Sequence, residues 1–163
     1  MNGPDKLYRL LEDLNIPFEY LEHPAAPTVA VAKKYWAGHD AVHCKNLFFR
    51  NHKGDRHYLV VLDCEQDVDI HSIEKLLHQG KLSFASPERM VKYLGVTPGS
   101  VTPFGLINDA AHHVHTFLDK NLQKAARLSF HPCINTASLI VAKDDFIRFM
   151  EDVRNRYEWV ELY

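Results

Sequence analysis

The sequence has few cysteines and no long hydrophobic run, and both absences limit what the protein can be. Its three cysteines, Cys44, Cys64 and Cys133, are widely spaced and form no CxxC pair, which indicates reduced thiols rather than a disulfide framework or a zinc site. No stretch approaches the ~20 apolar residues that a membrane span requires. The N-terminal segment carries acidic residues and lacks the apolar region of a signal peptide. We therefore expect a soluble, cytoplasmic protein that has no membrane partner.

The chain also lacks a strong net charge. Its formal net charge is −2 at pH 7, so any affinity for RNA has to come from a local group of cations. The hydrophobic fraction of 46% is ordinary for a globular protein. There is no repeat, low-complexity run or proline-rich linker, and the length of 163 residues therefore predicts a single domain over residues 1–163.

Four common catalytic motifs are missing as well. There is no GxxxxGK[ST] loop, no GxGxxG after a strand, no HExxH and no GxSxG. The sequence therefore lacks the motifs that are typical of kinases, dehydrogenases, zinc proteases and α/β-hydrolases. His112, His113 and His115 form the densest group of the eleven histidines and leave a metal-dependent hydrolase as an alternative. On a strand, His113 and His115 would share one face, but spacing places no third ligand. Locally hydrogen-bonded histidines are the favoured interpretation, and we expect no metal or other cofactor.

The hydrophobic pattern predicts helices alternating with strands. A leucine-rich helix begins at Pro4, and Thr28 is expected to cap a helix that ends at Gly38. The prolines and glycines of Val96–Leu106 argue against any regular element there. Hairpins mixed with crossover helices predict the α/β class with a mixed sheet. Further helices are expected before Gly80, after Ser86 and from Asp144, and strands at Phe18–Leu21, Val42–Arg50, Arg56–Leu62, Leu82–Phe84, Val114–Leu118, Ala126–Phe130 and Ser138–Ala142.

Three stretches combine residue types that suit a binding site. Lys45 lies in an apolar strand, where a lysine is either an edge residue that reaches solvent or a cation directed into a pocket. The Gly99–Gly105 loop either brings backbone N–H groups to an oxyanion or phosphate, or simply connects a helix to a strand. His131 lies between two apolar strands, where it hydrogen-bonds a substrate or a strand-end carbonyl.

In order and spacing, these stretches resemble the prolyl-tRNA editing family, which includes the YbaK-like proteins and the editing insertion of bacterial prolyl-tRNA synthetases. The resemblance rests on Lys45 and Asn46, on the GxxxP-Phe-Gly loop, and on His131-Pro132 followed by Asn135-Thr136. It runs from about Leu7 to the C-terminus. The Glu22–Thr28 turn and the KNLFFRN strand resemble the stand-alone branch more closely. The implied fold is a single-domain YbaK-like α/β fold, with a mixed, mostly antiparallel sheet surrounded by helices.

The resemblance further implies a metal-free hydrolysis of an aminoacyl ester, without a protein nucleophile and with help from the substrate's neighbouring ribose hydroxyl. Its partners would be the aminoacylated acceptor end of proline tRNA and, in addition, prolyl-tRNA synthetase. Lys45 would contact the terminal nucleotide, Gly99 and Pro103 would hold the ester end, and His131 would help define the amino-acid pocket. Further substrate-binding residues are expected beside them: Asn46, Leu47, Phe104, Gly105, Phe130, Asn135 and Thr136.

The favoured substrate is proline tRNA charged with alanine. A pocket shaped for proline cannot firmly reject alanine, because a missing methylene contributes only about 1–3 kcal/mol, so a second, smaller site completes a double sieve. Leu47, Phe104 and Phe130 are expected to narrow that site. The alternatives are cysteinyl-tRNA(Pro) as substrate, or a non-catalytic tRNA- or synthetase-binding module. Phosphate contacts around the entrance are expected from Lys33, Lys34, Arg50, Lys53 and Arg56.

Overall fold

The structure is a computed structural model, and it describes residues 1–25 and 29–163. Its strands are β1 (Glu19–Glu22), β2 (Val42–Asn51), β3 (His57–Asp63), β4 (Leu82–Phe84), β5 (His115–Asp119), β6 (Arg127–Phe130), β7 (Ala137–Ala142) and β8 (Tyr157–Val160). Its helices are α1 (Asp5–Asp13), α2 (Val29–Trp36), α3 (Ile70–Leu77), α4 (Pro87–Leu94) and α5 (Lys143–Val153), with the 3₁₀ helices η1 (Pro103–Asn108) and η2 (Lys120–Lys124).

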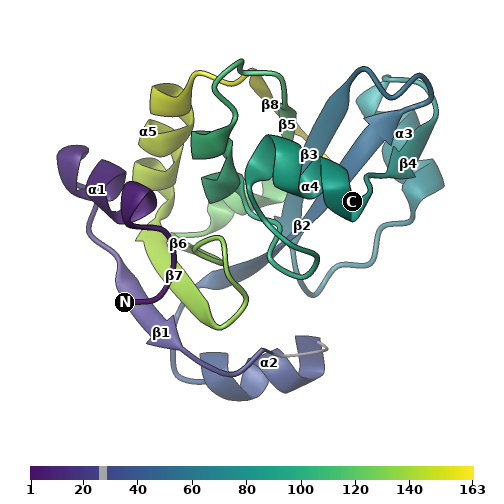
Figure 1. The fold of residues 1–163 in the computed structure, drawn as a ribbon. Coiled ribbons are helices and arrows are strands. Elements are labelled where there is room, and N and C mark those ends of the chain that lie inside the picture. The colour runs from purple at the N-terminus through teal and green to yellow at the C-terminus, as the bar shows by residue number, and fades with distance from the viewer. Residues whose placement is uncertain (26–28) are drawn as a thin grey trace.

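The strands form one sheet in the order β1-β7-β6-β2-β3-β5-β8, with β4 paired to β2 (Figure 1). Within the described residues, four strand pairings are antiparallel and three are parallel. The expected α/β class with a mixed, mostly antiparallel sheet is therefore confirmed. None of the helices in residues 1–25 and 29–163 is long and apolar enough to cross a membrane.

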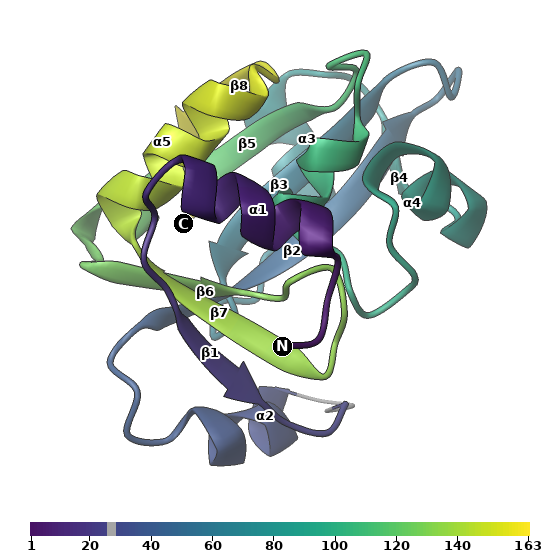
Figure 2. The same cartoon turned by 60° about the vertical axis from the view of Figure 1, so that its left-hand side comes forward.

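Alternating side chains on the central strands build a core on each face of the sheet. Phe48, Leu59 and Val61 pack into a cluster that includes residues of α1, α5 and η1. Phe49 and Leu62 belong to a second cluster with residues of α3. Figure 2 shows α1 and α5 side by side over the first cluster. Both faces are thus covered, which explains the unbroken apolar run Tyr58–Leu62 within β3.

Strand β2 joins the two halves of the sheet. Val42 and His43 pair in parallel with β6, whereas Cys44 through Arg50 pair antiparallel with β3. The change of partner falls between His43 and Cys44, one residue before Lys45. Side chains from this part of β2 therefore lie where the two halves of the sheet meet.

Two predictions about regular structure were wrong, and one lies outside the described residues. Val96–Leu106 was expected to hold no regular element, yet η1 begins at Pro103, where the Thr102 hydroxyl accepts a hydrogen bond from the Phe104 N–H at 3.3 Å. Proline fixes φ near the helical value and favours this start. Strand β8 was not expected, because its four half-buried residues give no clear alternation. The expected cap Thr28 belongs to the residues that the structure does not describe.

Candidate functional site

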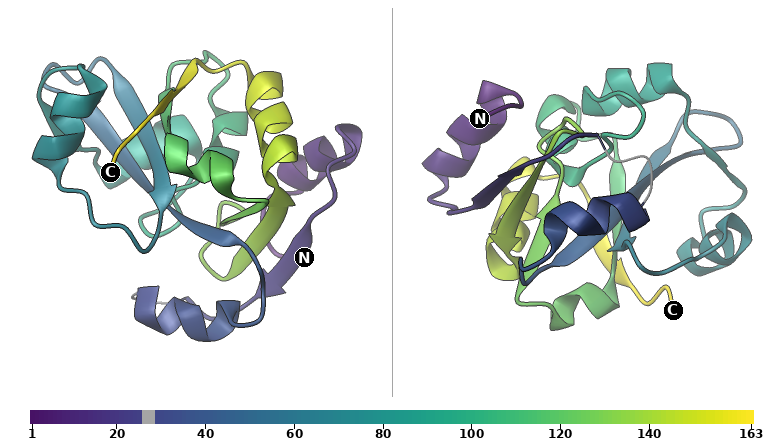
Figure 3. Two further views of the ribbon diagram at one scale, coloured as in Figure 1. Left: turned by 180° about the vertical axis from the view of Figure 1, so that it is seen from behind. Right: turned by 90° about the horizontal axis from the view of Figure 1, so that it is seen from below.

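Six of the predicted site residues line one cavity of about 390 Å³. The cavity lies among β2, helix α2, the loop that precedes η1, and the turn between β6 and β7. Helix α2 lies below β1 and β2 in Figure 1, and the view from below in Figure 3 shows it crossing in front of β2. The six residues are Lys45, Asn46, Leu47, Gly99, His131 and Asn135.

Five other predicted residues are not among the described residues that line the cavity. Phe104 and Phe130 are almost completely buried in the core, with ring centroids 5.6 Å apart in an edge-to-face contact. The expectation that they narrow the pocket is therefore corrected, because other core side chains pack against both rings and leave no ring surface to face the cavity. Pro103 is buried as the first residue of η1. The Thr136 carbonyl accepts the His23 N–H at 3.0 Å.

Gly105 has a packing role rather than a place in the cavity wall. A Cβ atom at this position would lie 2.7 Å from the carbonyl oxygen of Leu94. Real Cβ contacts are longer than this, so η1 can approach the end of α4 only where the side chain is absent. Its expected contact with substrate stays a prediction, and packing against Leu94 accounts for the glycine without it.

Lys45 places a cation at the cavity. Its Nζ lies 3.6 Å from the Asp67 carboxylate, and the Lys45 side chain is 27% exposed while that of Asp67 is fully exposed. An ion pair this long and this open to solvent contributes little stability. Lys45 lies in a central strand and lines the cavity, and its role as a cation for an anionic ligand stays a prediction.

Asn46 connects β2 to the glycine loop and keeps one acceptor unused. Its Nδ2 donates a hydrogen bond to the Val101 carbonyl oxygen at 3.1 Å. Its Oδ1 is buried and has no hydrogen-bond partner among the described residues. A buried acceptor without a partner costs about 1–3 kcal/mol, so a donor on a ligand would gain free energy by binding there.

The glycine loop reaches the cavity through Gly99 and Val101. Gly99 has φ +88°, and a Cβ atom there would lie 3.4 Å from the Asn135 amide nitrogen. The left-handed backbone of Gly99 is strained for other residues, and it lets the loop lie against Asn135. The loop and the β6–β7 turn thereby form adjoining parts of the wall.

His131 presents a neutral imidazole with a defined tautomer. Its Nδ1 lies 2.9 Å from the Ala137 carbonyl oxygen. A carbonyl only accepts, so Nδ1 carries the proton and Nε2 keeps a lone pair. Burial lowers the pKa of His131, more than the Ala137 carbonyl raises it. The neutral form with Nε2 as acceptor therefore prevails at pH 7.

His23 and Trp36 also line the cavity, and the sequence did not single them out as site residues. The Trp36 indole N–H donates to the Ser138 hydroxyl oxygen at 3.3 Å. The His23 Nδ1 donates to the Pro24 carbonyl at 2.9 Å, so Nε2 accepts the Ser138 hydroxyl at 2.9 Å. The two contacts with Ser138 join residues more than 100 positions apart, and no sequence pattern indicates them.

Two thiols in the cavity wall are poorly suited to act as nucleophiles. Cys44 and Cys64 both line the cavity. Burial raises the pKa of the Cys64 thiol to about 11 and raises that of Cys44 well above its ordinary value. Both thiols are therefore protonated at pH 7, and thiolate attack is disfavoured.

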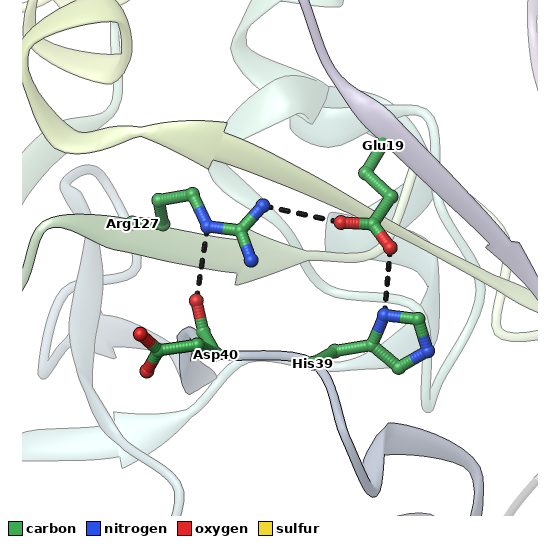
Figure 4. A network of polar contacts seen from close by, with 4 residues as sticks. All are labelled: Glu19, His39, Asp40 and Arg127. Carbon is green, nitrogen blue, oxygen red and sulfur yellow. Dashed lines mark hydrogen bonds and ion pairs between the residues drawn. The ribbon is translucent and has the colours of Figure 1, made fainter.

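The segment after α2 is fastened to the sheet by a charged network (Figure 4). The Glu19 carboxylate lies 2.6 Å from His39 Nδ1 and accepts Arg127 at 3.1 Å, and Arg127 also donates to the Asp40 carbonyl at 2.9 Å. These hydrogen bonds, from Arg127 first and His39 second, lower the pKa of the Glu19 carboxyl. The network holds the connection between α2 and β2 against β1 and β6.

The three neighbouring histidines do not converge on one point. His113 Nε2 lies 2.9 Å from His57 Nδ1, while His57 Nε2 accepts from Arg89 at 2.8 Å. His115 pairs with the Glu158 carboxylate at 2.8 Å. Within the part of the chain that the structure describes, there is no group of three or more His, Cys, Asp or Glu side chains arranged to hold a metal ion.

The cations expected at the entrance differ in their surroundings. The Lys33 ammonium lies 2.6 Å from the Glu65 carboxylate, and Arg50 donates to the carbonyls of Asn51 and His52. Lys34, Lys53 and Arg56 are exposed. None of these five cations is among the described residues that line the cavity, and their contacts with phosphates stay a prediction.

Comparisons with known proteins agree with this arrangement. A family model described as "Aminoacyl-tRNA editing domain" matches residues 23–149. The chain is 33% identical to the prolyl-tRNA editing protein ProX of Acetoanaerobium sticklandii, over 99% of both chains. It is 28% identical to prolyl-tRNA synthetase associated domain-containing protein 1 of Danio rerio, over 92% of this chain and 82% of that protein. A solved structure of a proposed trans-editing enzyme for prolyl-tRNA synthetase has a TM-score of 0.68 at 19% identity, covering 98% of this chain and 99% of that one.

Proposed function

The chain belongs to the aminoacyl-tRNA editing domain family, and on that premise we propose that it hydrolyses proline tRNA wrongly charged with alanine. The observation that carries this proposal is the convergence of Lys45, Gly99 and His131 on one cavity. The three residues come from distant parts of the sequence, and each offers a different interaction. Together they suit a substrate with a phosphate, an ester and a hydrogen-bond donor. The reaction would take place in the cytoplasm, where tRNA is charged.

Lys45 supplies the positive charge of the site. Its ammonium would bind a phosphate of the terminal nucleotide and displace the exposed carboxylate of Asp67. A charge-assisted hydrogen bond of this kind contributes about 1.5–3 kcal/mol. The terminal nucleotide would thereby be held beside β2 with its ribose in the cavity.

Two acceptors would orient the aminoacylated ribose. His131 Nε2 and the unpartnered Asn46 Oδ1 both offer lone pairs in the wall of the cavity. The substrate carries matching donors, namely the amino group of alanine and the free ribose hydroxyl. With these donors held, the ester carbonyl would lie against the backbone of Gly99 and Val101. The reaction then needs only positioning and stabilisation of the oxyanion, because an aminoacyl ester is already activated.

Water is the proposed nucleophile, with help from the ribose hydroxyl of the substrate and without a metal ion. The high pKa values of Cys44 and Cys64 argue against a covalent thioester route. A metal-dependent route would require ligands that the described cavity wall does not group together. The tRNA is thus both the substrate and a participant in its own hydrolysis.

The preference for alanine is proposed to depend on the apolar part of the wall. Leu47, Met90 and Val101 line the cavity together with the polar residues. In a stiff site, the larger proline ring would be excluded by steric clash, which discriminates more strongly than lost contact does. The alternative substrate, cysteinyl-tRNA(Pro), differs from alanine by one sulfur atom and competes for the same space.

The alternative class is a non-catalytic module that binds tRNA or prolyl-tRNA synthetase. The names of similar proteins refer to the synthetase, and association with that enzyme is part of our proposal. The hydrogen-bond acceptor of His131 and the positive charge of Lys45 would also suit a protein that binds charged tRNA without hydrolysing it. Catalysis is therefore the property to test.

The test is hydrolysis of proline tRNA charged in turn with alanine, cysteine, serine and proline. We expect rapid release of alanine, with proline spared, and Lys45→Ala serves as the matched inactive control. Fastest release of cysteine would favour the alternative substrate. Binding of charged tRNA without any hydrolysis would favour the non-catalytic module, and equal release of proline and alanine would contradict editing.

A further inference from the structure

A second cavity of about 290 Å³ adjoins the candidate site. Trp36 and Cys64 belong to the walls of both cavities. The second cavity is bounded by the end of α2, the start of β2 and the end of β3. His43, two positions before Lys45 and on the same face of β2, lies in its wall.

The His43 imidazole has no hydrogen-bond partner. Both Nδ1 and Nε2 are buried, and neither bonds to another described residue. The ring stacks on the Trp36 indole with centroids 4.1 Å apart and planes within 3° of parallel. Buried polar atoms without partners are rare in folded proteins, and each is costly. A phenylalanine would make the same stack without that cost, so stacking alone does not explain a histidine here.

The ring is uncharged at neutral pH. Burial, with smaller contributions from the nearby His39 and His23, lowers the pKa of His43 to about 4. A neutral imidazole offers one N–H donor and one acceptor at a fixed spacing. Such a pair matches a ligand edge that carries both an acceptor and a donor, as the edges of nucleobases do.

The charges around the cavity favour a neutral ligand. Asp63 and Glu65 lie in its wall, and its lysine, Lys33, is already paired with Glu65 at 2.6 Å. A phosphate would meet a net negative charge in this cavity, whereas Lys45 offers it a cation in the adjoining one. The two cavities together therefore suit a nucleotide whose phosphate and base lie on different sides of Trp36.

We propose that the second cavity is a nucleobase subsite, in which the neutral His43 imidazole hydrogen-bonds the base of the terminal nucleotide and the Trp36 indole stacks on it. This inference rests on the proposed function, because it assumes a substrate that ends in a nucleotide. It adds His43 and Trp36 as residues that determine which base is accepted.

The base reaches His43 when the indole slides along the imidazole. Both ring nitrogens are covered by other atoms of the protein, so access to them requires a movement of the Trp36 side chain. Trp36 is held by one hydrogen bond to Ser138, and its length of 3.3 Å is beyond the usual range for N–H···O bonds. Stacking of the base on the indole would offset the loss of the contact between the indole and the imidazole.

The experiment uses two nonhydrolysable probes. One is the amide analogue of 3′-alanyl-adenosine 5′-phosphate, and the other is the same compound with hydrogen in place of the base. Affinities of both are measured by calorimetry for the wild-type protein and for His43→Phe, which keeps the ring stack and removes both nitrogens. We expect His43→Phe to bind the adenine-containing probe about tenfold more weakly, which corresponds to one or two lost neutral hydrogen bonds, and to bind the base-free probe as the wild type does.

Equal losses for both probes, or no loss for either, would overturn the subsite. A second measurement does not depend on the folding of His43→Phe. The chain has two tryptophans, so in Trp159→Phe the fluorescence reports Trp36 alone. Because Trp36 also lines the first cavity, the adenine-containing probe should change that fluorescence more than the base-free probe does; identical responses contradict the proposal. Hydrolysis of Ala-tRNA(Pro) by the wild type tests the proposed function separately.

Discussion

The carbonyl oxygen of Ala137 accepts the Nδ1 proton of His131 at 2.9 Å, across the turn that joins β6 to β7. This single contact decides which nitrogen of His131 is available to a substrate. Because the partner is a backbone carbonyl on a buried strand, no side-chain rearrangement can reverse the tautomer. Only protonation can remove the acceptor.

Activity should therefore fall in acid. Protonation turns Nε2 from an acceptor into a donor and repels the amino group of the substrate. Since burial lowers the pKa of His131, the loss should occur below the ordinary histidine value of about 6.5, with no loss due to His131 above it. The measurement is kcat/KM between pH 5 and 8. His131→Gln keeps an amide acceptor and should lose this acidic limb; an unchanged limb would refute the assignment.

Lys45→Ala should nearly abolish deacylation while the fold is kept. Loss of a charge-assisted contact of about 2–3 kcal/mol lowers kcat/KM by roughly 30- to 150-fold. Asp67→Asn is the matched control: it removes the carboxylate 3.6 Å from the Lys45 ammonium and should lower KM. Wild-type turnover by folded Lys45→Ala would show that the lysine is not part of the site.

Substrate selectivity should respond to Leu47 and not to Phe130. Leu47 lines the cavity, so Leu47→Ala should admit larger amino acids, including proline, before alanine hydrolysis is lost. Phe130 is 2% exposed in the core, so Phe130→Ala should instead lower the free energy of unfolding by about 3–5 kcal/mol. Deacylation of Ala-, Cys- and Pro-charged proline tRNA, together with urea unfolding, separates the two effects. A stable Phe130→Ala with broadened selectivity would place this ring in the pocket after all.

Stability should fall as the pH falls from about 6.5 towards 4. Burial is the main cause that lowers the pKa values of His43 and His57 to about 4, so between these limits the unfolded chain binds more protons than the folded one. Each histidine then lowers the free energy of unfolding by about 1.4 kcal/mol per pH unit. Urea unfolding at a series of pH values measures the slope. His43→Phe should reduce it by the share of one histidine, and an unaltered slope would show that His43 titrates normally.

Chelation should leave activity unchanged. We expect protein treated with EDTA to hydrolyse charged tRNA at the original rate, because the proposed reaction uses the ribose hydroxyl and no metal ion. Loss of activity, followed by recovery with zinc, would transfer the assignment to a metal-dependent hydrolase.

The sequence predicted the site through residues whose chemistry conflicts with their surroundings. Lys45 in an apolar strand, and His131 between two such strands, are out of place unless they serve a ligand, and both line the cavity. Phe130 was misplaced because it precedes His131 in sequence, although adjacent residues of a strand point to opposite faces. Phe104 was misplaced because it belongs to the glycine loop in sequence, whereas its ring packs into the core. Nearness in sequence is thus a poor guide to membership of a site.

Other parts could not be predicted because they depend on contacts between distant segments. Trp36 joins the site through Ser138, and Gly105 is needed for its approach to Leu94. Neither relationship leaves a periodic signal in the chain. The same holds for β8, whose partner β5 lies about 40 residues earlier. The hydrophobic runs, by contrast, predicted the α/β class and most strands, since burial on both faces of a sheet demands them.

The position of β2 between β6 and β3 has a consequence for how the site is lost. The backbone of Cys44, Lys45 and Leu47 is paired with β3 in the middle of the sheet, so it can open only when β2 separates from β3. Hydrogen exchange at these amides should proceed only through global unfolding. Enzymatic inactivation by denaturant and the loss of secondary structure would then share one midpoint. Protein that retains its native circular dichroism signal would also retain Lys45 in its position in the site.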